Sequence, residues 1–257
     1  MTVLQYDEDA SKRLLAVYTT PDVEQQRLEF INSIDLNIND IVLDVGSGPG
    51  FLAMAMAKKV GPKGKVYGID ISEYLLKLAK LKCKDIQSIE FKYGSAADTE
   101  FPDENFNKLI CTQVLEYVQD VDLALNEFNR VLKKGGKIAL LDTDWDSIVW
   151  NSNDPNRMSK ILKEWEGHAT YPFLPSTLAS RMTKSGFKIE KVKVIPLLNH
   201  HYNPNTYSNR MIDLIVPYVV NKGSISLQVA EAWANELRNQ ENYFFSLNRY
   251  LFIGTKI

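Results

Sequence analysis

The sequence predicts an α/β protein with a doubly wound, seven-stranded and mostly parallel sheet, an antiparallel last strand and an inserted helical cap. Three observations support this fold class. Short apolar runs alternate with helical segments between residues 41 and 142. Runs such as IVLDV and IALLD are apolar almost throughout, which is typical of strands covered by helices on both faces. The connections are short, as expected for right-handed crossover units that place successive strands in parallel.

The alternating part of the chain divides into elements at clear signals. Two helices are expected within residues 8–35, separated at Thr20 and Pro21, because proline suits the first turn of a helix. Ser72 is expected to cap the helix that it precedes. The predicted strands cover residues 41–45, 65–69, 88–93, 108–112 and 137–142, and the predicted helices cover residues 51–60, 72–84 and 120–132.

The alternation stops after Asp142. Residues 154–168 and 175–185 have helical patterns, and residues 187–198 have the pattern of a strand. A helical insertion follows at residues 203–240, before a last strand at residues 243–255. We expect the last two strands to pair as a hairpin whose connection has expanded into a cap.

Composition limits the class of protein. A length of 257 residues favours one large domain. The formal net charge of -2 and the pI of about 6.0 argue against nucleic acid as the main partner. The two cysteines form no CxxC pair, the first residues contain no apolar signal segment, and no apolar run approaches a membrane span. We therefore expect a cytoplasmic protein without a membrane span. The sequence makes no prediction of its oligomeric state.

The stretch DVGSGPG, at residues 44–50, predicts a ligand site. It lies between the first strand and the first helix, where an open parallel sheet binds its ligands. Glycines 46, 48 and 50 allow close approach of the backbone, and the helix N-terminus offers free N–H groups. Asp70 ends the second strand, where a ribose-binding carboxylate is expected. Phe51 occupies the position of a dinucleotide fold's third glycine, and the P-loop lysine is missing, so a pyrophosphate ligand is disfavoured.

Together, VLDVGSGPG, VYGIDIS and GSAADTEFPDENFN resemble the class I S-adenosylmethionine-dependent methyltransferases, over roughly residues 36–145. Within that family the sequence is most similar to the small-molecule methyltransferases of the ubiquinone and menaquinone biosynthesis type. The resemblance implies a Rossmann-like fold with S-adenosyl-L-methionine as cofactor. We accordingly divide the chain into N-terminal helices over the cofactor site (1–35), a methyltransferase core (36–198 and 241–257) and a helical cap (199–240).

The resemblance implies a role for each matching residue. Asp44 would order the glycine turn and help to hold the methionine amino group, and Asp70 would accept hydrogen bonds from both ribose hydroxyls. Ile71 would lie against the adenine. The full implied set is Asp44, Gly46, Ser47, Gly48, Gly50, Asp70, Ile71, Ser95, Ala96, Thr112 and Gln113. Two positions depart from the family pattern: Ser95 replaces a common aspartate, and Thr99-Glu100 replaces Leu-Pro.

The stretch LLDTDWDSIVW, at residues 140–150, is expected beside the reacting methyl group. If it is extended, Asp142, Asp144 and Asp146 share one face, and Thr143 and Trp145 share the other. We favour Asp144 as the functional acid, and the alternative is that these acids cap the following turn or pair with Arg249. The pattern departs from a calcium loop at its later positions, so no metal site is predicted.

Further candidates come from the end of the chain. Besides Asp144, the candidate catalytic residues are His200 and Tyr243, and the candidate substrate-pocket residues are Tyr6, Tyr18, Trp145 and Arg249. His200 and His201 are adjacent on an extended segment, so their rings are expected to face opposite ways. Aromatic residues of a strand are more often core residues than site residues. A buried Arg249 would need a carboxylate partner, with Asp142 as first choice.

The leading hypothesis is S-adenosylmethionine-dependent methyl transfer to a small, partly apolar molecule beneath the cap. Methylation of RNA or protein is an alternative that would require a charged docking surface, and CTQV replaces the D/N-P-P-Y motif of enzymes that methylate nucleobases. A non-catalytic subunit that binds S-adenosylmethionine would carry the same cofactor motifs. A nicotinamide-dependent oxidoreductase is disfavoured by Phe51.

Overall fold

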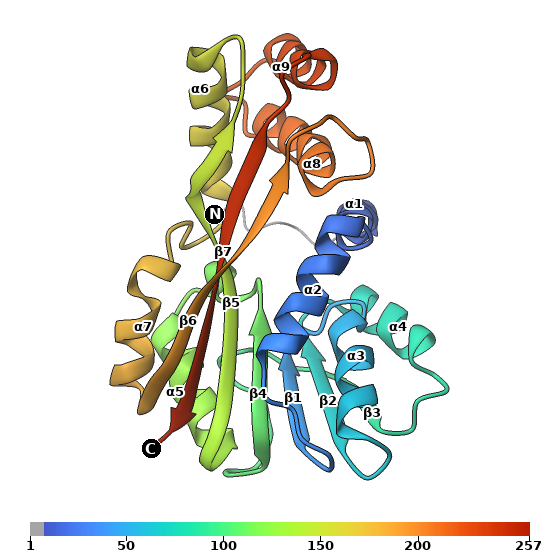
Figure 1. Cartoon of the computed structure of the whole chain (residues 1–257), viewed down its shortest axis with the longest axis vertical. Coiled ribbons are helices and arrows are strands. Elements are labelled where there is room, and N and C mark those ends of the chain that lie inside the picture. The colour runs from blue at the N-terminus through green and yellow to red at the C-terminus, as the bar shows by residue number, and fades with distance from the viewer. Residues whose placement is uncertain (1–7) are drawn as a thin grey trace.

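A seven-stranded mixed sheet forms the centre of the computed structural model, which describes residues 8–257 (Figure 1). The strand order is β3-β2-β1-β4-β5-β7-β6, and β7 runs antiparallel to both of its neighbours. The strands are β1 (Ile41–Val45), β2 (Lys65–Asp70), β3 (Ile89–Tyr93), β4 (Phe106–Thr112), β5 (Leu132–Trp150), β6 (Phe187–Asn199) and β7 (Phe245–Lys256). The predicted fold class and the predicted hairpin of the last two strands are confirmed.

The helices begin and end near the expected residues. They are α1 (Glu8–Tyr18), α2 (Pro21–Ser33), α3 (Phe51–Val60), α4 (Glu73–Lys82), α5 (Val121–Val131), α6 (Pro155–Trp165), α7 (Pro175–Lys184), α8 (Tyr207–Asn221) and α9 (Leu227–Asn239), with short 3₁₀ turns η1 (Leu115–Tyr117) and η2 (Glu166–His168). Ser72 caps α4 as predicted, because its hydroxyl accepts a hydrogen bond from the amide of Leu75. Pro21 begins α2 after the break at Thr20.

Strand β5 is much longer than the sequence predicts. The prediction placed a helix up to residue 132 and a strand at residues 137–142, whereas α5 ends at Val131 and β5 continues for 19 residues. Pairing with other strands explains the difference. At one end Leu132 pairs with Phe106 of β4, and at the other end Trp150 pairs with Phe245 of β7. These distant partners supply backbone hydrogen bonds that the local sequence does not reveal.

The cap is also larger than the predicted range 199–240. Helix α6 packs with α8 and α9 around the outer ends of β5, β6 and β7, at the top of Figure 1. One apolar cluster joins Trp150 and Ile161 to Ile212 and Trp233. The chain around residues 145–168 therefore belongs to the cap, because its apolar side chains are buried against α8 and α9.

Two layers of helices cover the lower sheet and leave its upper edge for ligands. One apolar cluster includes α5 and α7, and another lies under α2, α3 and α4 on the opposite face. The carboxyl ends of β1, β2 and β4 meet below α1 and α2 (Figure 1). None of the helices within residues 8–257 has the length and apolar composition that crossing a bilayer requires.

Candidate active site

The glycine turn leaves β1 and enters α3 with three left-handed residues. Their φ angles are 69° at Gly46, 51° at Gly48 and 81° at Gly50. A Cβ atom on Gly46 would lie 2.1 Å from a methyl group of Val114, whereas nothing lies within 4 Å of the corresponding position on Gly48. Packing therefore requires a glycine at 46, while Gly48 faces open space.

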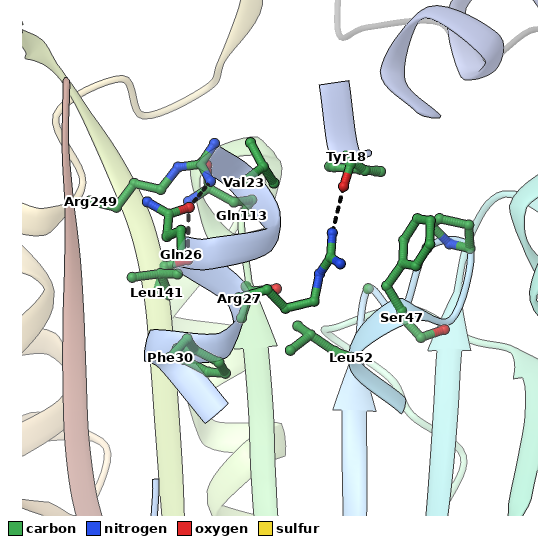
Figure 2. Close-up of a pocket in the computed structure, with 15 residues that line it drawn as sticks. Tyr18, Val23, Gln26, Arg27, Phe30, Ser47, Leu52, Gln113, Leu141 and Arg249 are labelled. Carbon is green, nitrogen blue, oxygen red and sulfur yellow. Dashed lines mark hydrogen bonds between the residues drawn. The ribbon is translucent and has the colours of Figure 1, made fainter. Parts of the chain in front are cut away.

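That open space belongs to a cleft between the glycine turn and α2, and the empty space in the cleft and at its mouth, open solvent included, is about 620 Å³ (Figure 2). The cleft is lined by Tyr18, Val23, Gln26, Arg27, Phe30, Gly46, Ser47, Gly48, Pro49, Phe51, Leu52, Thr112, Gln113, Leu141 and Arg249. The turn forms one wall, and α2, the end of β4 and inner residues of β5 and β7 form the other.

Asp70 fixes the shape of the turn. Its two carboxylate oxygens accept hydrogen bonds from the amides of Gly48 and Ser72, each at 2.8 Å. Burial raises the pKa of Asp70, and the backbone donors oppose that shift. Each carboxylate oxygen has two acceptor positions, so Asp70 retains capacity for donors from a ligand.

Asp44 is the least satisfied polar group of the site. Its side chain is buried, and neither carboxylate oxygen has a hydrogen-bond partner among the described residues. Burial first, and the charge of Asp70 second, raise the pKa of Asp44 to about 8. Asp44 lies directly before the glycine turn and is not among the residues that line the cleft. A buried carboxylate without partners is costly, so a cationic donor that reached Asp44 from a bound ligand would stabilise it. Asp70, rather than Asp44, orders the glycine turn.

Arg249 lies at the other end of the cleft, on β7. Its Nε donates to the hydroxyl of Thr143 at 3.2 Å, and its Nη1 donates to the side-chain oxygen of Gln26. The predicted pairing with Asp142 is wrong, because Arg249 is opposite Thr143 in the sheet and the side chains of Asp142 and Thr143 point to opposite faces. Asp142 instead accepts hydrogen bonds from the amides of Val114 and Glu116.

Helix α2 contributes a face that the sequence analysis did not identify. Val23, Gln26, Arg27 and Phe30 line the cleft. Arg27 donates to the carbonyl of Tyr18 at 2.6 Å, and its guanidinium carbon lies 4.5 Å from the ring centre of Phe51. The spacing of three and four residues indicates one helix face, although it does not show what that face meets.

The three candidate catalytic residues do not line the cleft. Asp144 accepts a hydrogen bond from the amide of Asp146 at 3.3 Å, which is the turn-capping alternative. His200 and His201 are exposed beyond the end of β6, and their ring centres are 4.2 Å apart instead of facing opposite ways. Tyr243 is buried in the cap, where its hydroxyl donates to Ser208 at 2.6 Å.

The substrate-pocket candidates divide between two places. Tyr18 and Arg249 line the cleft, whereas Trp145 lines a separate groove beside α6. Trp145 donates to the carboxylate of Glu116 at 3.0 Å. Burial raises the pKa of Glu116 to about 7, against the opposing effect of Arg249. Tyr6 lies outside the described residues.

Three of the implied cofactor-binding residues, Ile71, Ser95 and Ala96, lie beyond the lining of the cleft. Ile71 is exposed just after Asp70, and Ser95 accepts a hydrogen bond from the amide of Ala97 at the end of β3.

The unusual Thr99 is buried and donates to Glu127 through both its amide and its hydroxyl, which fixes the loop. Gly50 is the N-cap residue directly before α3, and Ala96 is buried. Within residues 8–257, no three His, Cys, Asp or Glu side chains form a group that could hold a metal ion.

The chain matches a family model described as a methyltransferase domain over residues 36–201. It is 32% identical over 180 residues to a demethylmenaquinone methyltransferase of Lactobacillus johnsonii, an alignment that covers 63% of this chain and 73% of the relative. A solved phosphoethanolamine N-methyltransferase 2 of Haemonchus contortus, in complex with S-adenosyl-L-methionine, superposes with a TM-score of 0.64 at 17% identity. That superposition covers 99% of this chain and 58% of the other. The YcgJ protein of Bacillus subtilis also gives a TM-score of 0.64, at 18% identity, over 91% of this chain and 98% of its own.

Proposed function

The chain belongs to the class I S-adenosylmethionine-dependent methyltransferases, and we propose that it transfers a methyl group to a small, partly apolar molecule bound at the Arg249 end of the cleft. The unpartnered carboxylate of Asp44, directly before the glycine turn, carries the cofactor part of this proposal, because a cationic amino group would give it the partner that it lacks. The relative named for demethylmenaquinone supports a small apolar acceptor.

The cofactor half of the cleft suits S-adenosyl-L-methionine. Asp44 would hold the amino group of the methionine part, and Asp70 would accept hydrogen bonds from the ribose. Gly48 leaves space for the ligand above the turn. When bound, the cofactor supplies a methyl group attached to a positively charged sulfur. The carbon of that methyl group is already activated toward a nucleophile.

The residues of this chain mainly position the cofactor and the acceptor and exclude water from the cleft. Gln113 lies between the two halves, with a left-handed φ of 56° and with its amide donating to the carbonyl of Leu141. Its side-chain oxygen accepts a hydrogen bond from Thr143 at 2.5 Å, so its position is fixed. Val23, Phe30 and Leu141 make the acceptor half partly apolar. A fixed, partly dry cleft favours the alignment that a displacement at carbon requires.

Calorimetric titration with S-adenosylmethionine, S-adenosylhomocysteine and NADH tests the proposal. We expect the first two to bind and NADH not to bind. Asp70→Ala should abolish binding of both sulfur compounds while the circular dichroism spectrum stays that of a folded protein. Binding of NADH alone, or unchanged affinity in Asp70→Ala, would contradict the proposal. Screening of small acceptors with radiolabelled methyl groups would then identify the product.

A further inference from the structure

A phenylalanine on the glycine-turn side of the cleft is in contact with two cations. Phe51 is the first residue of α3, directly after Gly50. The guanidinium carbon of Arg27 lies 4.5 Å from the centre of its ring, and the ammonium nitrogen of Lys82 lies 3.7 Å from the same centre. Arg27 and Phe51 line the cleft, whereas Lys82 is exposed and is not among the lining residues. Of these two cations, Arg27 is therefore the one that a ligand inside the cleft would meet.

The guanidinium group of Arg27 has no carboxylate within ion-pair distance among the described residues. Its Nη2 donates to the carbonyl of Tyr18 at 2.6 Å, and Figure 2 shows the side chain reaching from α2 toward that carbonyl. Burial lowers the pKa of Arg27, with Glu24 opposing the shift, and burial together with the charge of Arg27 lowers the pKa of Lys82. Two partly desolvated cations that repel each other are stabilised when an anion binds beside them.

The start of α3 adds backbone donors at the same place. No side chain caps this helix, because its N-cap residue is Gly50. Phe51 and Leu52 belong to the first turn, where the amides lack partners within the helix, and both residues line the cleft. A helix N-terminus carries a partial positive charge that favours anions. The guanidinium group of Arg27 and the first turn of α3 thus lie together on one side of the cleft.

The charges at the two ends of the glycine turn match those of an α-amino acid. The unpartnered carboxylate of Asp44 lies directly before the turn, and Arg27 lies over the residue that follows it. An α-amino acid carries its carboxylate on the same carbon as its amino group, so a ligand whose amino group reaches Asp44 also brings an anion to the turn. The other cation that lines the cleft, Arg249, is on β7 and is held by Thr143 and Gln26.

We infer that Arg27 binds the carboxylate of the methionine part of S-adenosylmethionine and makes the protein selective for sulfonium nucleosides that keep this carboxylate. The inference rests on the proposed function and deepens its cofactor site. A guanidinium group has five N–H donors, so Arg27 has enough of them to hold a carboxylate through two hydrogen bonds and to keep its bond to Tyr18. Because Tyr18 ends α1, the bound carboxylate would also fix the junction of α1 and α2 over the ligand.

Decarboxylated S-adenosylmethionine tests this selectivity, because it keeps the nucleoside, the sulfonium and the amino group and lacks only the carboxylate. In calorimetric titrations, the full-length protein should bind S-adenosylmethionine at least about 10-fold more tightly than the decarboxylated compound. Arg27→Gln should weaken binding of S-adenosylmethionine by about 10- to 100-fold, the usual effect of losing hydrogen bonds to a charged group. It should not weaken binding of the decarboxylated compound, so the preference should disappear. Arg27→Lys should keep part of it.

Lys82→Gln is the matched control, because it removes the other cation on Phe51 and leaves the lining of the cleft unchanged. This protein should keep the preference of the wild type. Equal affinities of the wild type for the two compounds would overturn the inference, and this outcome does not depend on whether a variant folds. A full preference in Arg27→Gln, or an equal loss in Lys82→Gln, would overturn it too. If neither S-adenosylmethionine nor S-adenosylhomocysteine binds the wild type, the proposed function fails instead.

Discussion

Asp44 shows how one residue links folding to cofactor binding. In the unliganded protein its pKa is raised to about 8, whereas an aspartate in an unfolded chain ionises near ~3.9. Between those pH values the folded protein holds a proton that the unfolded chain has lost. The contribution of Asp44 to the free energy of unfolding therefore falls as the pH rises from about 4 to about 8.

The same group should make cofactor binding depend on pH. A cationic amino group favours the ionised form of Asp44, so binding releases a proton, and the affinity for S-adenosylhomocysteine should rise as the pH approaches about 8. Calorimetric titration in two buffers of different ionisation enthalpy measures the released proton. Asp44→Asn should lose most of the affinity and all of the proton release.

The Asp44→Asn protein should also be more stable than the wild type at pH 8 without ligand, because it no longer ionises a buried group. Asp40→Asn is a matched control at the opposite end of β1, where Asp40 accepts a hydrogen bond from the amide of Asn37. Full affinity in Asp44→Asn would rule out the role assigned to this carboxylate.

Substitutions of the turn's glycines should have two different effects, one on cofactor affinity and one on stability. Gly48→Ala introduces strain of about 1 kcal/mol from its left-handed backbone and places a methyl group in the ligand's space, so it should fold but bind the cofactor at least about 10-fold less tightly. Gly46→Ala adds a collision with Val114 and should be far less stable. Urea unfolding and calorimetry measure both effects.

Gly223→Ala is the matched control for backbone strain alone. Gly223 has a φ of 82°, has nothing within 4 Å of its Cβ position and lies in the cap. Its substitution should cost as much stability as Gly48→Ala and leave cofactor affinity unchanged. Equal cofactor affinities in the wild type, Gly48→Ala and Gly223→Ala would mean that the turn does not contact the ligand.

At the scale of elements, Asp22 joins α2 to α8 and β6. Its carboxylate accepts hydrogen bonds from the amide of Tyr207, at the start of α8, and from the side chain of Asn199 at 3.0 Å. Asp22→Ala should lower the free energy of unfolding by about 1–3 kcal/mol, because these donors lose their partner.

Chemical denaturation, with Gln25→Ala as the control, tests this link. Gln25 is exposed on the same helix, so its substitution should change stability by less than about 0.5 kcal/mol. An Asp22→Ala protein as stable as the control would show that α2 is not fastened through this carboxylate.

At the scale of the whole molecule, local patterns predicted what is local. The positions of the glycine turn, of Asp70 at the end of β2 and of the helix cap at Ser72 follow from nearby residues. The structure has all three at the expected positions. The length of β5, the partner of Arg249 and the face presented by α2 depend on strands and helices that are distant in sequence. His200 and Tyr243 were candidate catalytic residues because their side chains can transfer protons. Their positions outside the cleft follow from how the cap folds.

The fastening of α2 determines where the molecule can open. Polar contacts tie the helix to β6 and α8, through Asp22, Gln26 and the ion pair of Glu29 with Lys193. It also packs against α3, because Phe30 and Ile31 share a buried apolar cluster with Met56 and Val60, and the side chain of Lys59 donates to that of Asn32 at 3.1 Å. The helix is thus held on both sides of the cleft. Exchange of a ligand therefore requires movement of side chains such as that of Arg27, which stacks on Phe51, rather than movement of the whole helix.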